Sequence, residues 1–168
     1  MRNFIYVCDN NKGRSPALEI YTRGFLHDLG VKGIRVSSAG VWKDSIAKLI
    51  REGHNRPSHT VSEILLQQGY DIRDHTLTHL GEIVNPYIVL AVNSDVYNSA
   101  LEHFPALKDK IMLAGEYIRS HKHREIYGPG HESRKNISSE RERYVRMLYE
   151  LEGLAKRVSI RIRREFSQ

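Results

Sequence analysis

The sequence of 168 residues contains one cysteine, one tryptophan, five prolines and no long hydrophobic run. A single thiol cannot form an internal disulfide, so we expect a reducing, cytoplasmic environment. No stretch approaches ~18 consecutive apolar residues, and the first residues lack the pattern of a signal peptide. The chain is therefore expected to be soluble and to have no membrane partner.

Histidine occurs at nine positions, but the histidines and the one cysteine do not have the spacing of a structural zinc site. His121 and His123 lie two positions apart, a spacing that could place two imidazoles on one metal, yet no third ligand accompanies them. We interpret them as surface histidines and expect neither a metal nor another cofactor.

The chain has 26 lysine and arginine residues against 20 aspartate and glutamate residues, a net charge of +6. This excess favours anionic partners, namely phosphorylated protein, free phosphate esters or nucleic acid. Nucleic acid is the least favoured, because basic residues on one face of an amphipathic terminal helix are usually only solvated. The basic residues in that helix are Lys156, Arg157, Arg161, Arg163 and Arg164.

Apolar segments with the period of strands alternate with segments that have the period of helices. The run Tyr-Ile-Val-Leu-Ala-Val at 87–92 suits a strand buried on both faces, which is typical of a parallel sheet. We predict an α/β fold with a single domain over 1–168, a three-layer sandwich in which helices flank a four-stranded parallel sheet. The predicted strands are 4–7, 34–38, 87–92 and 111–113, and the predicted helices are 16–29, 46–50, 60–68, 94–104 and about 139–163.

Two residue pairs have the spacing of a capping box, in which a Ser or Thr and a Glu three positions later satisfy backbone groups at a helix start. Thr60 and Glu63 form one pair, and Ser139 and Glu142 form the other. Arg, Lys, His, Gly and Ser dominate the basic segment 119–138. A loop of that length in a compact domain is a candidate functional segment.

The segment Cys-Asp-Asn-Asn-Lys-Gly-Arg-Ser at 8–15 lies between a predicted buried strand and the start of a predicted helix capped by Ser15. A loop of this length can curl so that its backbone N–H groups point inward, next to the positive end of the helix dipole. We interpret it as a cradle for a phosphate group after the first strand. Its candidate binding residues are Asp9, Asn10, Asn11, Lys12, Gly13, Arg14 and Ser15.

Inside such a cradle the Cys8 thiol would lose its proton readily and attack phosphorus. Arg14 offers a planar fork of donors that can hold two phosphate oxygens. The Ser15 hydroxyl can donate to the thiolate and stabilise it as a leaving group. Trp42 and Tyr127 are candidates to line the pocket mouth and stack on a substrate ring.

The pattern Cys-x5-Arg-Ser-Pro after an apolar strand resembles the signature loop of the low-molecular-weight protein-tyrosine phosphatases, whose fold is shared with arsenate reductases. Residues 36–40, which end in Ser-Ala-Gly, resemble a second element of that family. The segment Gly-Tyr-Asp-Ile-Arg-Asp-His, which ends at His75, and residues 87–93 resemble two more.

The resemblance implies a metal-free, cysteine-dependent phosphatase that hydrolyses phosphomonoesters, foremost phosphotyrosine in proteins, and releases inorganic phosphate. Cys8 would carry a cysteinyl-phosphate intermediate, and Arg14 would bind the phosphate. Glu125 aligns with the late-loop acid that protonates the leaving oxygen. Asn11 would hold the loop in a left-handed turn through hydrogen bonds that reach His75, with Ser15 as a further support.

The chain departs from the family's usual pattern at several positions. Asn10 and Gly13 replace the usual glycine and a frequent second cysteine, and Lys12 stands where a small or apolar residue is common. Glu125 stands where the family has the aspartate of an Asp-Pro pair. Two alternative functions therefore stay open: an arsenate reductase coupled to a small thiol, and a non-catalytic phosphate-binding module.

Overall fold

The computed structural model describes residues 1–120, 125–132, 136 and 139–166. Four parallel strands form its sheet in the order β2-β1-β3-β4. Their bounds are β1 Arg2–Cys8, β2 Ile34–Gly40, β3 Ile88–Ala91 and β4 Ile111–Leu113. The first strand is central and its side chains from Phe4 to Val7 are fully buried, as expected for an inner strand of a parallel sheet.

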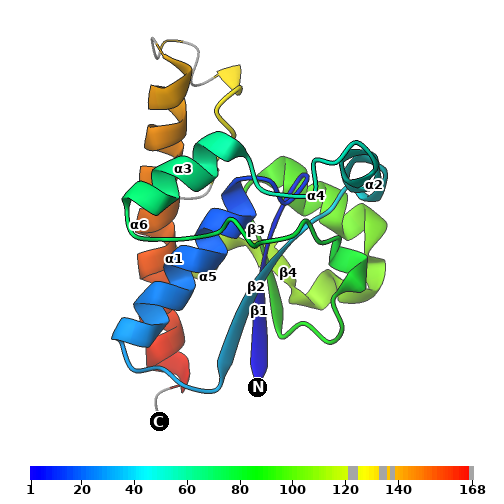
Figure 1. Cartoon of the computed structure of the whole chain (residues 1–168). Helices are drawn as coiled ribbons and strands as arrows, with labels where there is room; N and C mark the ends of the chain where they lie inside the picture. Colours follow the sequence, from blue (N-terminus) through cyan, green and yellow to red (C-terminus); the bar gives the residue numbers. More distant parts are fainter. Residues whose placement is uncertain (121–124, 133–135, 137–138, 167–168) are drawn as a thin grey trace.

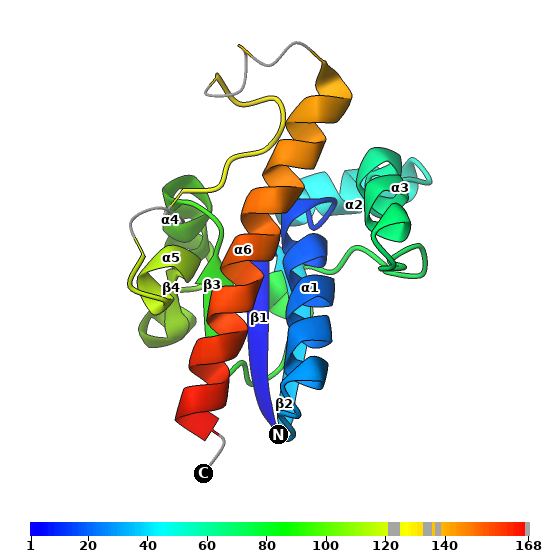
Figure 2. The same ribbon diagram turned by 90° about the vertical axis from the view of Figure 1, so that its left-hand side faces the viewer.

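Helices cover both faces of the sheet and complete the predicted three layers (Figure 1). The α-helices are α1 Arg14–Asp28, α2 Lys43–Arg51, α3 His59–Gln67, α4 Ser94–His103, α5 Ala114–Tyr117 and α6 Glu140–Phe166. Short 3-10 helices, η1 Leu80–Glu82 and η2 Pro105–Lys110, lie before β3 and β4. Figure 2 shows α1 and α6 side by side over β1, with α4 on the opposite face (Figure 1). The α/β class and the parallel sheet are therefore confirmed.

The long helix α6 begins and ends where specific contacts hold it. Its start follows the prediction, because Ser139 Oγ accepts a hydrogen bond from the Glu142 backbone N–H at 3.1 Å. The helix extends past residue 163 to Phe166, whose ring lies 6.0 Å from the ring of Phe4 and 5.7 Å from that of Tyr87. Aromatic packing at the amino end of β1 thus stabilises the last turn.

Three predicted helix starts were wrong, and α2 begins at Lys43 rather than at residue 46. Helix α3 begins at His59 behind Ser58, so Thr60 lies inside the helix and forms no capping box. The reason is that the Ser58 backbone N–H donates to the Lys12 carbonyl at 2.7 Å, which fixes where the chain turns. Helix α1 begins at Arg14, one residue before the predicted Ser15 cap.

The described parts of the basic segment 119–138 contain neither an α-helix nor a β-strand. Ile126 is nevertheless 1% exposed, and its backbone N–H donates to the Val92 carbonyl at 3.0 Å. The segment therefore returns to the carboxyl end of β3. His121 and His123 lie outside the described residues. None of the helices in the described ranges combines the length and the apolar composition that a membrane span requires.

Candidate active site

Cys8 is the last residue of β1 and lies at the carboxyl end of the sheet, opposite Gly40 of β2. Its side chain is 3% exposed, and its Sγ lies 3.0 Å from Ser15 Oγ. The loop passes so close to β2 that a Cβ atom on Gly40 would lie 2.7 Å from the Asp9 carbonyl oxygen. Only glycine fits there, so β2 forms a tight wall behind the loop.

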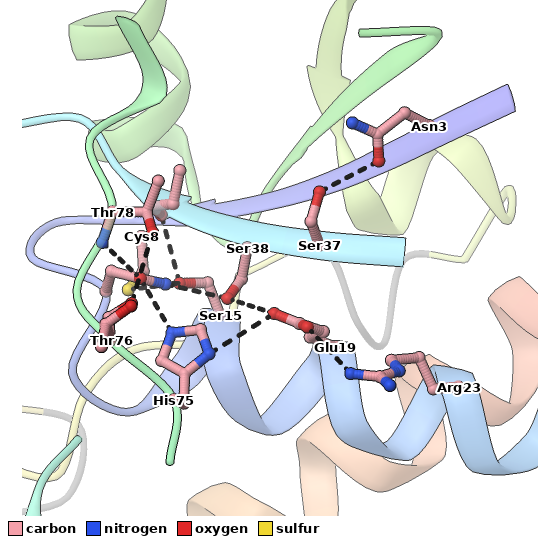
Figure 3. A network of polar contacts seen from close by, with 12 residues as sticks. Asn3, Cys8, Ser15, Glu19, Arg23, Ser37, Ser38, His75, Thr76 and Thr78 are labelled. Carbon is pink, nitrogen blue, oxygen red and sulfur yellow. Dashed lines mark hydrogen bonds and ion pairs between the residues drawn. The ribbon is translucent and has the colours of Figure 1, made fainter. Parts of the chain in front are cut away.

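The loop is held by Asn11, which is fully buried and has a φ of 58°. This left-handed conformation is the one expected for Asn11, and asparagine tolerates it better than most residues. Its Nδ2 donates to the hydroxyls of Ser15 at 3.0 Å and Ser38 at 2.9 Å, both of which are labelled in Figure 3. Its Oδ1 accepts from the Thr78 backbone N–H and from His75 Nε2, each at 3.0 Å. The side-chain amide thus joins the loop to α1, to β2 and to residues 75–78.

His75 takes a defined tautomer in this network. Because Asn11 Oδ1 is an acceptor, the proton of the neutral imidazole is on Nε2, and Nδ1 faces Glu19 Oε2 at 3.7 Å. Burial lowers the pKa of His75, and the Glu19 carboxylate offsets part of that shift. The Glu19 carboxylate also accepts a hydrogen bond from Ser38 Oγ at 2.8 Å. The ring is therefore held neutral, as a support for the loop.

Glu19 is a site residue that the sequence reasoning missed. It lies one helical turn after Ser15 on α1, and the spacing of four residues places both side chains on the same side of the helix. That spacing was visible in the sequence. Ser38 and Thr78 were missed as well, and only the register of β2 and the path of the following loop bring them to Asn11.

The Ser15 hydroxyl has one proton and two neighbours that can accept it. It donates to the Ala39 carbonyl at 3.2 Å, and it also lies within hydrogen-bond distance of Cys8 Sγ. When Cys8 is a neutral thiol, its S–H can donate to Ser15 Oγ. When Cys8 is a thiolate, the hydroxyl can turn and donate to sulfur. Ser15 can therefore serve both protonation states of the cysteine without a backbone change.

Arg14 directs its guanidinium along the loop and is nearly buried, with 10% of its side chain exposed. One terminal nitrogen pairs with the Asp9 carboxylate, and the other donates to the Ile126 carbonyl at 3.1 Å. The first residue of the loop and the late segment thus meet at the same cation. The Asp9 side chain is 41% exposed, so water or a ligand can reach this pair.

The late segment brings Glu125 and Tyr127 to the same end of the sheet. The Glu125 carboxylate accepts hydrogen bonds from the Ser94 backbone N–H at 2.9 Å and from the Ser94 hydroxyl. Partial burial and the adjacent Glu125 carboxylate raise the pKa of Tyr127. The Tyr127 ring stacks on His131 with centroids 3.7 Å apart. Glu125 therefore sits at the start of α4, one residue from the carbonyl that binds Arg14.

The remaining predicted residues border the loop at different depths. The Trp42 backbone N–H donates to the Asp9 carbonyl at 3.2 Å, while the Trp42 residue is 51% exposed. Within the described residues, the buried Asn10 Oδ1 has no hydrogen-bond partner. Lys12 is half-buried and Gly13 precedes α1.

In the described part of the chain, no group of three His, Cys, Asp or Glu side chains could hold a metal.

A buried thiol at the end of a parallel strand, inside a loop closed by an arginine, defines a protein that binds an oxyanion and can attack it. The chain matches the family described as low molecular weight phosphotyrosine protein phosphatase over residues 3–167, and it belongs to that family. It is accordingly a cysteine-based phosphatase, a hydrolase with phosphorylated substrates and phosphate as product. No curated protein sequence matches it.

Solved structures share the fold at low identity. YwlE arginine phosphatase from Geobacillus stearothermophilus is 23% identical, with a TM-score of 0.74 over 98% of this chain and 95% of that one. A low molecular weight protein tyrosine phosphatase from T. tengcongensis is 23% identical, with a TM-score of 0.73 over 94% and 97%. Vibrio vulnificus Wzb in complex with benzylphosphonate is 19% identical, with a TM-score of 0.74 over 95% and 97%.

Proposed function

We propose that this phosphatase hydrolyses phosphotyrosine in proteins through a covalent phosphate on Cys8. The observation that carries the proposal is the placement of Cys8, which is 3% exposed and has its Sγ 3.0 Å from Ser15 Oγ, in the same loop as the nearly buried Arg14. Because Cys8 is buried, a phosphate group must be carried on a long side chain to reach it. The long, flat side chain of tyrosine meets this need better than the short side chain of serine.

In the first step the Cys8 thiolate attacks phosphorus, and the bond from phosphorus to the tyrosine oxygen breaks. Arg14 exchanges the Asp9 carboxylate for two phosphate oxygens and stabilises the charge that develops on them. Glu125 must first turn away from Ser94 and take up a proton from solvent; as a carboxylic acid it then gives that proton to the leaving tyrosine oxygen.

In the second step water attacks the phosphorus bound to Cys8. Glu125, now a carboxylate, takes a proton from that water, and the bond from sulfur to phosphorus breaks. Inorganic phosphate is released and the thiolate returns. The Ser15 hydroxyl supports this step because it can donate to the departing sulfur.

Trp42 and Tyr127 support an aromatic substrate. Trp42 follows β2 and is half-exposed beside the loop, and Tyr127 directly follows the residue whose carbonyl binds Arg14. In this proposal the rings of Trp42 and Tyr127 stack against the ring of phosphotyrosine. A thiolate nucleophile must stay reduced, so we also propose that the protein works in the cytoplasm.

Phosphoarginine is a second candidate substrate, and one observation favours it. The Asp9 carboxylate is 41% exposed at the phosphate loop and could pair with a guanidinium leaving group after Arg14 has turned to the phosphate. One similar structure is a protein named as an arginine phosphatase. In this case Asp9 would hold the leaving group, whereas phosphotyrosine makes no use of its charge.

The test compares peptides of one sequence that carry phosphotyrosine, phosphoarginine or phosphoserine, with a reductant and without added metal. We expect kcat/KM to be highest for phosphotyrosine, and Cys8→Ser to abolish turnover while binding of phosphate persists. Faster hydrolysis of phosphoarginine would replace the proposed substrate with the second candidate. Turnover that survives Cys8→Ser would exclude the covalent mechanism for either substrate.

A further inference from the structure

A groove of about 530 Å³ adjoins the phosphate loop on the side of α3. Its lining comes from three separate stretches: the loop itself, the connection from α2 to α3, and the first turns of α6. The lining residues are Lys12, Gly53, His54, Arg56, Pro57, Ser58, His59 and Tyr144. None of these side chains is acidic.

The groove is joined to the phosphate loop through Lys12. The Lys12 carbonyl accepts a hydrogen bond from the Ser58 backbone N–H at 2.7 Å, which ties the start of α3 to the loop. Lys12 therefore belongs both to the loop after Cys8 and to the groove wall. The start of α3 also adds the positive end of a helix dipole to this side of the loop.

The basic side chains lie at the rim of the groove. His54, Arg56 and His59 are exposed, while Lys12 is half-buried. Arg56 is partly fixed, because its guanidinium donates to the Arg73 carbonyl at 3.1 Å. A compact ligand with two phosphates needs donors that converge on one point. Charges spread along an open rim instead suit an extended chain with several separate negative charges.

We propose that this groove binds acidic side chains next to the phosphorylated residue of a protein substrate. The proposal rests on the proposed function, since it places the phosphorylated residue at Cys8 and the acidic residues over Lys12 and Arg56. Carboxylates that meet the rim cations would speed association and lower KM, with little effect on kcat. The contribution would weaken as salt is added.

The first test measures binding to the Cys8→Ser protein, so that turnover does not interfere. Two phosphotyrosine peptides are compared, one with aspartates on both sides of the phosphorylated residue and one with asparagines in their place. We expect the acidic peptide to bind more tightly, and Arg56→Gln to weaken that binding roughly two- to fivefold while the neutral peptide is unaffected.

Arg35→Gln is the matched control, because it removes the same charge at the other end of β2, where Arg35 is exposed and lies opposite Asn3. It should leave the difference between the two peptides unchanged. Since Arg56 also binds a backbone carbonyl, thermal unfolding of Arg56→Gln must show an intact fold. Equal affinity of the two peptides for the Cys8→Ser protein would overturn the proposal.

A second measurement does not depend on the phosphorylated residue. The acidic peptide without phosphate is titrated into the protein, and the ring signals of His54 and His59 are followed by NMR. We expect these signals to shift, and the shift to shrink in Arg56→Gln. If the histidine ring signals do not shift, the proposal that the groove binds acidic side chains is wrong, even if phosphotyrosine is hydrolysed. Rings that respond while phosphotyrosine peptides are not hydrolysed would support the groove and reject the proposed substrate.

Discussion

The carboxylate of Asp9 pairs with the guanidinium of Arg14 within the same phosphate loop. The cation that should receive a phosphate is therefore held by an anion of the chain itself. A substrate must displace Asp9 before Arg14 can bind two phosphate oxygens, and the displaced carboxylate then stands close to a dianion. Asp9 thus competes with phosphate for Arg14.

Asp9→Asn should tighten the binding of inorganic phosphate. The variant removes both the competing ion pair and the repulsion between Asp9 and phosphate. The expected gain is roughly two- to fivefold, the value of a partly exposed ion pair. The inhibition constant of phosphate against para-nitrophenyl phosphate hydrolysis measures it. An unchanged inhibition constant would mean that breaking the Asp9–Arg14 ion pair takes no free energy away from phosphate binding.

Glu125→Gln should slow substrates with poor leaving groups more than those with good ones. A proton donor is worth roughly 10²- to 10⁴-fold when the leaving oxygen is basic. We expect kcat for phenyl phosphate to fall about 10²-fold, and kcat for para-nitrophenyl phosphate to fall far less. Ser94→Ala is the control, because it removes a hydrogen bond of the Glu125 carboxylate and keeps the acid. Equal losses for both substrates would show that Glu125 only anchors the late segment to α4.

Asn11→Ala and Asn11→Gly should separate the backbone role of Asn11 from its side-chain role. Both variants lose the hydrogen bonds to Ser15, Ser38, His75 and Thr78, which should cost roughly 2 to 4 kcal/mol of unfolding free energy. Alanine must also adopt a φ of 58°, which costs about 1 kcal/mol more, whereas glycine adopts it freely. Urea unfolding measures both values. A glycine variant as stable as the wild type would assign the role of Asn11 to its backbone alone.

Acid should weaken the folded state through His75. Because burial lowers its pKa in the folded protein, the unfolded chain binds a proton at a higher pH than the folded chain does. The stability from a neutral His75 is therefore fully present above the ordinary histidine pKa, and it is lost as pH falls below that value. Glu19 opposes the shift, while Arg23 and Arg56 reinforce it.

His75→Gln keeps a side-chain N–H that can donate to Asn11 and removes the titration. We expect its unfolding temperature to depend less on pH between 7.5 and 5.5 than that of the wild type. His27, which is exposed on α1, provides the comparison through His27→Gln, which should leave the wild-type pH dependence unchanged. If His75→Gln retains the full acid sensitivity, another group is responsible.

Much of the fold could be predicted because strands and helices alternate with clear periods. The short strand Ile111–Leu113 was predicted at its observed bounds, and the start of α6 followed from Ser139 and Glu142. The start of α3 was misplaced because a hydrogen bond from Ser58 to Lys12, distant in sequence, decides it. Local capping patterns cannot reveal a bond between two separate loops.

The site was predictable where one short segment carries it. Cys8, Arg14 and Ser15 lie in one loop, so their spacing alone indicated an anion cradle. The pairing of Asp9 with Arg14 depends on how the loop curls, and the position of Glu125 depends on where a long segment returns to the sheet. Neither can be obtained from spacing. Glu19 could have been found, since it lies four residues after Ser15 on the same helix.

The side chain of Asn11 links the first loop to β2 and to residues 75–78. A fragment that ends before His75 would lack the two bonds to His75 and Thr78, so the loop cannot take its final shape while the chain is only partly folded. Because these hydrogen bonds join residues that are distant in sequence, the loop forms only together with the cooperative folding of the sheet. Catalytic competence should therefore appear only at the last stage of refolding, in the same transition as global structure.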